Sequence, residues 1–364
     1  MDPFLIVTHI GAGNHSISKS YSYKRLLKEA LKQKDLISAS QVLEASTLTN
    51  TGYGSSLNLE GKVKCDSSFI YFENGLKSQG SLYNVTKKYP ILETVRCYEF
   101  LDLLYLREIN NMGLTRPLIL DHDSISTFQR LTSLPNPIET SDHNMGNEDL
   151  VIPKMHKIYE RYRGRLFETG KNAELHSELR NEISDTIGIC CIQENNSYVA
   201  TSSGGNFFKL PGRIGCAAIV GAAIDFIRRE GYEIWCMCSG NGEDIIQMQL
   251  AHYIVGSLNL KDPYDFCQNV VSLICERSKF FCMNGINNDG EPIVYVGVVV
   301  VIKCLADDQC HIVYCHSTQS FYFGFKLHDQ EEELIISRLK QSSKAGKTFA
   351  RGEFKVSSKR SFKK

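Results

Sequence analysis

The sequence has no excess of charge of either sign, since 41 lysine and arginine residues stand against 41 aspartate and glutamate residues. This balance removes the electrostatic reason to expect a dedicated nucleic-acid or membrane-surface binder. Long hydrophobic runs are also missing, and none approaches the ~20 residues that span a bilayer. The apolar residues 4–7 are too few, and lack the basic flank, for a secretory signal. We therefore expect no nucleic-acid partner and no membrane partner.

A complete disulfide framework is excluded because thirteen cysteines cannot all pair within one chain. Cys190 and Cys191 are adjacent in an apolar run, and Cys216, Cys236 and Cys238 lie among other small or apolar residues. Such cysteines are typical of buried thiols in a reducing compartment, so we expect an intracellular protein. No cysteine pair has the spacing and histidine partners of a structural zinc site, and we expect no metal.

Expected strands and helices alternate along the chain, and strands begin each half. A length of 364 residues fits one large domain or two smaller ones. Apolar runs predict strands, and apolar residues at helical spacing predict amphipathic helices. The expected strands cover residues 4–9, 55–58, 63–72, 187–192, 198–201, 234–238, 292–303, 310–316, 321–325 and 348–356. The expected helices cover residues 23–33, 37–45, 92–106, 123–131, 214–227, 244–255 and 262–277.

The middle of the chain has few hydrophobic side chains. Residues 135–148 are rich in proline, asparagine and other turn residues, which predicts a mobile loop. Residues 153–180 are charged and weakly helical, with little to bury. We therefore expect a mobile linker over about residues 135–180.

The C-terminal segment is basic. Residues 341–364 hold eight lysine and arginine residues and one glutamate, a net charge of +7. The simpler interpretation is a solvated tail on a cytoplasmic protein. The alternative is a nuclear targeting signal formed by Lys359, Arg360, Lys363 and Lys364.

The strongest local signal for chemistry is the junction Asp185-Thr186-Ile187-Gly188, where a polar segment meets an apolar strand. If the peptide bond before Thr186 were cut, this residue would carry both a hydroxyl and a free α-amino group. An α-amino group has a pKa of about 7.7–8.0 and suits a general base near neutral pH. Pairing a threonine hydroxyl with its own amine is a recognised way to activate it. The alternative is that Thr186 only begins a strand.

A second signal suggests an anion pocket. Ser202-Ser203-Gly204-Gly205 combines hydroxyl groups with glycines that permit close backbone approach. Arg213 follows, between Gly212 and Gly215. A guanidinium in this setting is either a two-pronged carboxylate clamp or an exposed loop charge.

A third signal is the glycine-rich turn Cys238-Ser239-Gly240-Asn241-Gly242-Glu243, which joins an expected strand to an expected helix. Backbone N–H groups at such a turn can stabilise an oxyanion. The alternative is a turn that needs glycine only for its backbone conformation. The glycine-rich segments near His9 and Asn50 have neither of the two glycine spacings of nucleotide-binding loops.

Together, these segments resemble the asparaginase/glycosylasparaginase branch of the N-terminal-nucleophile hydrolases, and within it most of all the threonine aspartases (taspases). The resemblance extends over nearly the whole chain. The segments that carry it are His9-Ile10-Gly11-Ala12-Gly13, Asn50-Thr51-Gly52-Tyr53-Gly54-Ser55, Gly61 with Cys65-Asp66, Asp185-Thr186-Ile187-Gly188, Ser202-Ser203-Gly204-Gly205, Pro211-Gly212-Arg213-Ile214-Gly215 and Ser239-Gly240-Asn241-Gly242-Glu243.

The resemblance implies an α+β fold, the four-layer αββα sandwich of the N-terminal-nucleophile hydrolases, as a single domain over residues 1–364. It also implies self-cleavage between Asp185 and Thr186. An α chain of residues 1–185 and a β chain of residues 186–364 would result, and two processed protomers would form an α2β2 heterotetramer.

The resemblance also assigns roles to individual residues. Thr186 matches the nucleophile, and Ser203 matches the hydroxyl residue that hydrogen-bonds it. Ser239 and Gly240 match the oxyanion hole. The expected substrate-binding residues are Arg213, which matches the arginine for the substrate carboxylate, together with Asn50, Cys216 and Gly242.

One departure from the family pattern bears on the substrate. Asparaginases of this family place an aspartate three residues after the arginine, where it binds the free α-amino group of the substrate. This sequence has Cys216 there, and a thiol cannot balance an ammonium group. A site that keeps Arg213 without the aspartate suits an aspartyl residue inside a polypeptide, and the threonine aspartases also lack that aspartate.

We therefore expect an intracellular, self-processing threonine endopeptidase that cleaves a protein substrate after an internal aspartate, without a cofactor. The alternative is an L-asparaginase, an isoaspartyl dipeptidase or a glycosylasparaginase-like amidohydrolase. A second alternative is a catalytically silent binding protein with the same fold, although a scaffold has no need of Thr186, Arg213 and Ser203.

Overall fold

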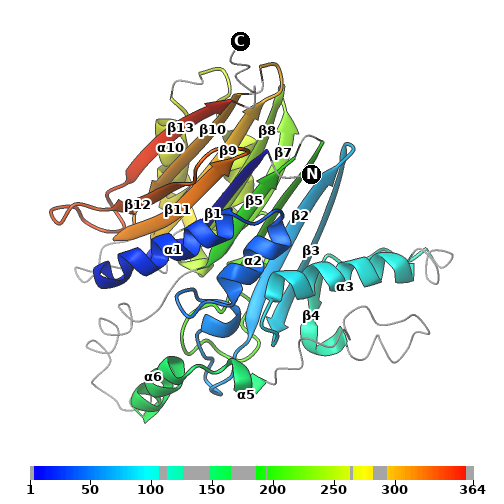
Figure 1. Ribbon diagram of the computed structural model, residues 1–364, viewed down its shortest axis with the longest axis vertical. Coiled ribbons are helices and arrows are strands. Elements are labelled where there is room, and N and C mark those ends of the chain that lie inside the picture. Colours follow the sequence, from blue (N-terminus) through cyan, green and yellow to red (C-terminus); the bar gives the residue numbers. More distant parts are fainter. Residues whose placement is uncertain are drawn as a thin grey trace.

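The computed structural model describes residues 4–105, 113–125, 147–164, 186–193, 195–262, 265–281, 293–307 and 309–357. Asp185, at the expected cleavage site, lies outside these residues, as do residues 135–146 and 165–180 of the expected linker. Two β-sheets and the helices that cover them make up most of the described chain (Figure 1). No helix within the described ranges is long and apolar enough to cross a membrane.

The larger sheet has eight strands in the order β12-β11-β1-β5-β6-β2-β3-β4. All neighbours are antiparallel except β3 and β4. Every residue of β1 and of β5 is buried, as their apolar sequences predict. The strand bounds are β1 Leu5–Gly13, β2 Cys65–Glu73, β3 Leu76–Val85, β4 Ile119–Asp121, β5 Ile187–Ile192, β6 Asn196–Ser203, β11 Ser320–Leu327 and β12 Glu333–Arg338.

The smaller sheet has five antiparallel strands in the order β13-β10-β9-β8-β7. Its bounds are β7 Ile224–Arg229, β8 Tyr232–Gly240, β9 Val296–Cys304, β10 Gln309–His316 and β13 Ala350–Ser357. One hydrophobic core joins the two sheets, because it contains Leu5 and Phe323 of the larger sheet and Trp235 and Val299 of the smaller one. Apolar surface from both sheets is thereby removed from water.

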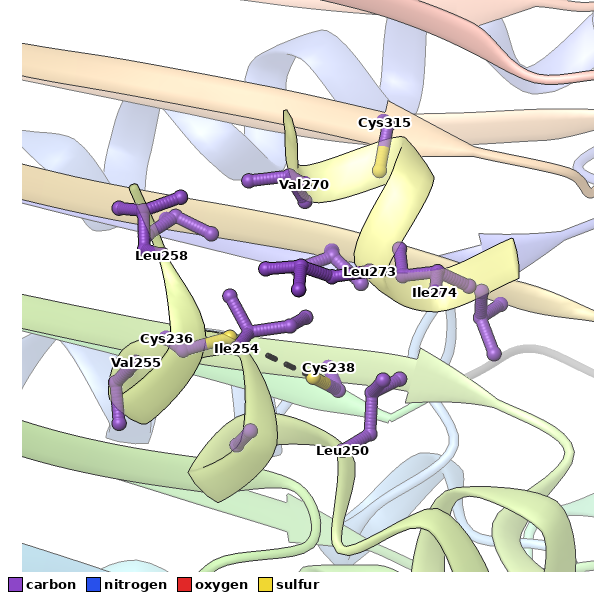
Figure 2. Close-up of a cluster of buried hydrophobic side chains, with 14 of the residues drawn as sticks. Cys236, Cys238, Leu250, Ile254, Val255, Leu258, Val270, Leu273, Ile274 and Cys315 are labelled. Carbon is purple, nitrogen blue, oxygen red and sulfur yellow. Dashed lines mark hydrogen bonds between the residues drawn. The ribbon is translucent and has the colours of Figure 1, made fainter. Parts of the chain in front are cut away.

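Helices cover the other face of each sheet. The amphipathic helix α1 (Ser20–Leu31) and α2 (Leu36–Glu44) pack on the larger sheet, with α3 (Pro90–Leu104) beside them. On the smaller sheet lie α8 (Gly242–Met248), α9 (Leu250–Ser257) and α10 (Phe266–Phe281). Figure 2 shows side chains of α9 and α10 packed against Cys236 and Cys238 of β8. The predicted α+β composition is confirmed.

The helix expected over residues 214–227 is wrong. The chain forms a single 3₁₀ turn, Cys216–Ala218, and then β7 at the edge of the smaller sheet. Gly221 has φ = +94°, which ends any helix there. The small residues Ala222 and Ala223 are fully buried because α9 packs closely at this point. Their small size serves close packing between elements rather than helix formation.

Other elements differ from prediction at backbone breaks. The expected helix over 244–255 is divided into α8 and α9 by Gln249, whose φ is +46°. Strands β3 and β12 were not predicted. β3 begins with exposed or half-exposed, mostly polar residues, and β12 is a six-residue strand with no fully buried residue.

Part of the expected linker is packed. Residues 147–164 contain α5 (Asn147–Leu150) and α6 (Pro153–Arg163). Met155, Ile158 and Tyr162 of α6 are buried in a hydrophobic cluster that also contains residues of α3. The expectation that this stretch has little to bury is therefore wrong for residues 153–163, because its few apolar residues share one helical face.

Candidate active site

Thr186 lies immediately before β5, opposite the end of β6. The antiparallel pairing of Ile187 with Ser202 brings Thr186 next to Ser203, although 17 residues separate them in sequence. The Thr186 hydroxyl donates a hydrogen bond of 3.1 Å to the Ser203 hydroxyl. The Gly205 N–H also donates to this oxygen, at 3.1 Å. Thr186 and Ser203 are each only 6% exposed, so the two hydroxyls form a largely enclosed pair.

Two further threonines fix the backbone around this pair. Thr8 of β1 donates a hydrogen bond of 3.1 Å to the carbonyl of Gly188. Thr201 of β6 donates one of 2.7 Å to the carbonyl of Ile187. Sequence reasoning missed both residues. Their signal was a hydroxyl within an expected strand, residues 4–9 for Thr8 and residues 198–201 for Thr201.

His9 lies against the residues that follow Thr186. A Cβ atom on Gly188 would be 2.2 Å from His9 Nε2, so only glycine fits there. Burial lowers the pKa of His9 to about 3, although an interaction with the Thr186 backbone acts against this shift. His9 Nδ1 accepts a hydrogen bond from the Gly11 N–H, which places the ring proton on Nε2. The imidazole is therefore neutral and adds no positive charge beside Thr186.

Asn50 fixes the loop that follows Ser203. Its side-chain amide donates to the Gly205 carbonyl at 2.8 Å and accepts from the Ser56 N–H at 2.8 Å. Its backbone carbonyl accepts from the Gly204 N–H at 2.6 Å. These three bonds show that Asn50 holds the glycine loop in place, and the expected contact of Asn50 with the substrate stays a prediction.

A buried network supports the same loop from behind. Thr51 donates to the Ser202 hydroxyl at 2.9 Å, and Ser202 donates to Glu44 at 2.7 Å. The Ile91 N–H donates to the same carboxyl oxygen at 3.0 Å. Burial raises the pKa of Glu44 to about 8, and the two hydrogen bonds to its carboxyl act against this shift. This network holds Ser202, and with it the adjacent Ser203, in place.

Ser239 and Gly240 end β8 in the smaller sheet. The fully buried Ser239 hydroxyl accepts a hydrogen bond of 3.1 Å from the Ala12 N–H of β1, so it joins the two sheets near the site. Because the Ser239 oxygen acts as the acceptor in this bond, its hydroxyl proton can still be donated to a second group. Gly240 has φ = +137°, and a Cβ atom there would lie 2.1 Å from the Tyr295 carbonyl oxygen. Only glycine can make this turn.

Arg213 lies in a cradle made by three glycines. A Cβ atom on Gly205, Gly215 or Gly242 would come within 2.7, 2.8 or 2.9 Å of a guanidinium nitrogen. Arg213 Nε and Nη2 each donate a hydrogen bond of 2.9 Å to the carboxylate of Glu243. The Arg213 side chain is 15% exposed. Gly205 therefore contacts both the guanidinium and, through its N–H, the Ser203 hydroxyl.

Cys216 and Gly242 lie beside Arg213. A Cβ atom on Gly242 would be 3.7 Å from Cys216 Sγ and 2.9 Å from Arg213 Nη2. Burial raises the pKa of the Cys216 thiol to about 12, although the Arg213 charge acts against this shift. The thiol is neutral at physiological pH, so this position offers no charge to an ammonium group.

An ion pair that the sequence did not assign lies on the other side of the arginine. Asp66 accepts a hydrogen bond of 2.8 Å from the Gly215 N–H, and Lys209 Nζ lies 3.5 Å from the same oxygen. The side chains of Lys209 and Asp66 are 3% and 1% exposed. Burial raises the pKa of the Asp66 carboxyl, and the Lys209 charge acts against this shift. Asp66 was noted only as part of a motif, and a carboxylate directly after a buried strand start was its signal.

Within the residues that the structure covers, no group of three or more histidine, cysteine, aspartate or glutamate side chains is arranged to hold a metal ion. The structure brings together Thr186, Ser203, Arg213, Cys216 and Gly242. Their shared contacts are with the glycine loop that follows Ser203 and with the one that follows Ser239.

Comparisons with known proteins relate this chain to asparaginases. Residues 121–294, which include Thr186, Arg213 and Ser239, match the sequence profile of a family described as asparaginase. A plant-type L-asparaginase of Pyrobaculum calidifontis is 25% identical over 235 residues, covering 60% of this chain and 68% of that protein. Its counterpart in Pyrococcus furiosus is 26% identical over 220 residues, covering 58% of this chain and 62% of that protein. An isoaspartyl peptidase/L-asparaginase of Xenopus laevis is 25% identical over 270 residues, covering 69% of this chain and 74% of that protein.

Proposed function

Because the chain is an asparaginase-family hydrolase, we propose that it cuts itself before Thr186 and then hydrolyses polypeptides after aspartate. The nucleophile is supported by the enclosed hydroxyl pair of Thr186 and Ser203. The single observation that carries the preference for polypeptides is the neutral Cys216 beside Arg213. The helices on the outer faces of the two packed sheets support the proposed αββα sandwich of the N-terminal-nucleophile hydrolases.

The proposed reaction begins when cleavage at residue 185 frees the Thr186 amine. With a pKa near 8, this amine accepts the proton of the Thr186 hydroxyl while the oxygen attacks the carbonyl carbon of the substrate aspartate. The Ser239 hydroxyl and the Gly240 N–H stabilise the oxyanion, each donor contributing roughly 3–4 kcal/mol. The peptide C–N bond then breaks, the amine leaves with a proton, and water hydrolyses the remaining ester.

Specificity follows from what surrounds Arg213. Its guanidinium binds the side-chain carboxylate of the substrate aspartate in a charge-assisted pair. A free amino acid also presents an α-ammonium group, which needs a negative partner in the site. The neutral thiol of Cys216 offers none, whereas an aspartyl residue within a polypeptide has no ammonium group to satisfy.

A second candidate function is hydrolysis of asparagine or of β-aspartyl dipeptides. The names of the relatives favour it, since they are called L-asparaginases or isoaspartyl peptidase/L-asparaginase. In that reaction Arg213 would bind the α-carboxylate of a small substrate. Cys216 weighs against this candidate for the reason just given. The proposed assembly, two processed protomers as α2β2, is the same for both candidates.

Self-processing is tested by the mass of the purified protein. The wild-type chain should give two fragments that meet between residues 185 and 186, whereas Thr186→Ala should give a single chain, because the attacking hydroxyl is gone. Intact-mass spectrometry measures both. A Thr186→Ala protein that still divides at this bond would show that another protease makes the cut.

The two candidate substrates are separated by a paired assay on the processed enzyme. We expect cleavage of a peptide with one internal aspartate, with little release of ammonia from L-asparagine or of aspartate from a β-aspartyl dipeptide. Turnover of the small substrates without peptide cleavage would establish the second candidate in place of the first.

A further inference from the structure

Two positively charged side chains with open hydrogen-bonding capacity meet at Gly205. We propose that Lys209 binds the substrate carboxylate together with Arg213, an inference that rests on the function proposed above. The site for the aspartate side chain is then formed by two cations rather than one. Lys209 becomes a determinant of the preference for a carboxylate.

The first observation is that the Lys209 ammonium is buried without hydrogen bonds. The residue is 6% exposed, and its Nζ has no hydrogen-bond partner among the described residues. Its nearest acidic oxygen, in Asp66, is 3.5 Å away, which is an ion pair but a long one. Burying an ammonium with unused donors is costly, and a bound anion would remove that cost.

The second observation is that Arg213 offers a free edge on the same side. Glu243 occupies its Nε and Nη2 atoms, and no hydrogen bond of Nη1 occurs within the described part of the chain. A Cβ atom on Gly205 would lie 2.7 Å from Arg213 Nη1 and 3.4 Å from Lys209 Nζ. Both nitrogens therefore approach one point above a glycine, which has no side chain of its own to fill it, and the nearest carbon to that point is Lys209 Cδ at 3.1 Å.

The third observation links this point to the nucleophile. The Gly205 N–H donates to Ser203, which accepts from Thr186. A carboxylate bound beside Gly205 is thus connected to the reacting Thr186 hydroxyl through the Gly205 N–H and the Ser203 hydroxyl. Its two oxygens can accept from Arg213 Nη1 and from Lys209 Nζ at once, because the lysine stem is flexible. A carboxamide cannot do so, since its NH₂ group accepts no hydrogen bond.

The competing explanation is that Lys209 only balances the buried charge of Asp66. Asp66 itself has a defined task, because it accepts the Gly215 N–H and so holds the loop that carries Arg213. A balancing lysine would affect every substrate equally. A lysine that binds the substrate carboxylate affects only substrates that possess one, and this difference makes the two explanations separable.

The test compares peptides with aspartate or asparagine at the cleaved position, using the processed wild type, Lys209→Met and a control. We expect Lys209→Met to lower kcat/KM for the aspartate peptide by about 10- to 100-fold, mainly through KM, as for a lost charge-assisted hydrogen bond. Slow cleavage of the asparagine peptide should change less than about twofold. The matched control is Lys77→Met, whose lysine pairs with the buried Asp225 at the opposite end of β2 and β3. It should leave both rates unchanged.

Each other outcome has a defined meaning. Equal losses on both peptides would overturn the proposal and assign Lys209 to charge balance. Rates that stay at the wild-type level on both peptides would overturn it as well. If Lys209→Met fails to fold, the double variant Asp66→Asn with Lys209→Met takes its place, because it leaves no unbalanced charge at this buried pair, and its ratio of the two rates is compared with that of the wild type. A wild type that cleaves neither peptide would reject the proposed function instead, and L-asparagine against its α-carboxamide would then test Lys209.

Discussion

At the scale of single residues, the proposed substrate specificity depends on two neighbours of Arg213, the charged Glu243 and the neutral Cys216. Glu243 already fills one edge of the guanidinium, so a substrate carboxylate must bind at the other edge or displace it. Cys216 lies in contact distance of the same glycine as Arg213, and it is neutral. Under the proposed function, the side chain at this position separates a site for free amino acids from a site for polypeptides.

Cys216→Asp should shift the enzyme toward small substrates. The new carboxylate can balance the α-ammonium group of L-asparagine, so hydrolysis of asparagine should rise above the wild-type level. Peptide cleavage after aspartate should fall about tenfold or more, because the carboxylate competes for Arg213 and repels the substrate aspartate. Ammonia release and peptide cleavage are measured side by side.

The control for this change is Cys216→Ser, which removes the thiol without adding charge. Effects shared by the two variants come from the lost thiol, and effects of Cys216→Asp alone come from the charge. A wild type that already hydrolyses asparagine efficiently would remove Cys216 as a discriminator between the two candidate functions.

At the scale of elements, the site depends on strand ends that a shared register brings together. Pairing of β5 with β6 places Thr186 beside Ser203, and pairing of β6 with β2 places Ser203 opposite Asp66. Helix α2 supports this edge through Glu44, its last residue, which accepts hydrogen bonds from Ser202 and Ile91. The titratable carboxyl of Glu44 thus connects α2 with β6 and α3.

Glu44→Gln should remove part of the pH dependence of stability. Glu44 has a pKa of about 8 in the folded protein against 4.5 for the ordinary side chain, so between these values the folded state holds a proton that the unfolded chain has released. Its contribution is complete below about pH 4.5 and is lost as the pH rises through about 8. A glutamine side chain can still accept the hydrogen bonds from Ser202 and Ile91, but it does not titrate. The variant should therefore be more stable than wild type at pH 9, by on the order of 3 kcal/mol, and similar to it at pH 5.

The measurement is the urea midpoint at pH 5, 7 and 9, made in the uncut Thr186→Ala background so that one chain unfolds. Glu60→Gln is the control, because Glu60 is exposed and pairs with the exposed Lys62 at the surface. A Glu44→Gln profile that runs parallel to the wild-type profile would show that Glu44 is not protonated in the folded protein.

At the scale of the whole molecule, the two halves of the chain are interleaved. Strand β1 from the first half lies between β5 and β11 from the second half. Strand β2 pairs with β6 in the same way. The core between the sheets also draws side chains from both halves. Cutting before Thr186 therefore breaks the chain without separating any paired strands.

The two fragments should stay together after self-processing. Their shared ladders and core bury apolar surface that either fragment alone would expose to water. Size-exclusion chromatography in native buffer should give one peak that contains both bands on a denaturing gel, and concentrated guanidinium should separate them. The uncut Thr186→Ala protein should elute at the same position as the processed wild type. Two native peaks would show that the halves are independent folding units.

Several features of the site could be predicted from the sequence because they depend on local chemistry. A hydroxyl residue before an apolar strand indicated Thr186, and glycine-rich turns after strands indicated the loops at Ser203 and Gly240. Buried strands were predicted well because they are continuous apolar runs. The segment 214–227 was predicted wrongly, because its small residues satisfy a helix and a closely packed edge strand equally well.

The sequence alone determined which groups are available: the threonine, the arginine, the thirteen cysteines and the absence of a charge at Cys216. Only the tertiary structure decided which groups meet. Lys209 and Asp66 are 143 residues apart and pair at 3.5 Å, and Arg213 reaches Glu243 across 30 residues. Such pairs depend on strand register and on the packing of two sheets, which arise from contacts between distant segments. A local sequence pattern does not specify those distances, because burial and charge pairing arise only when the chain folds.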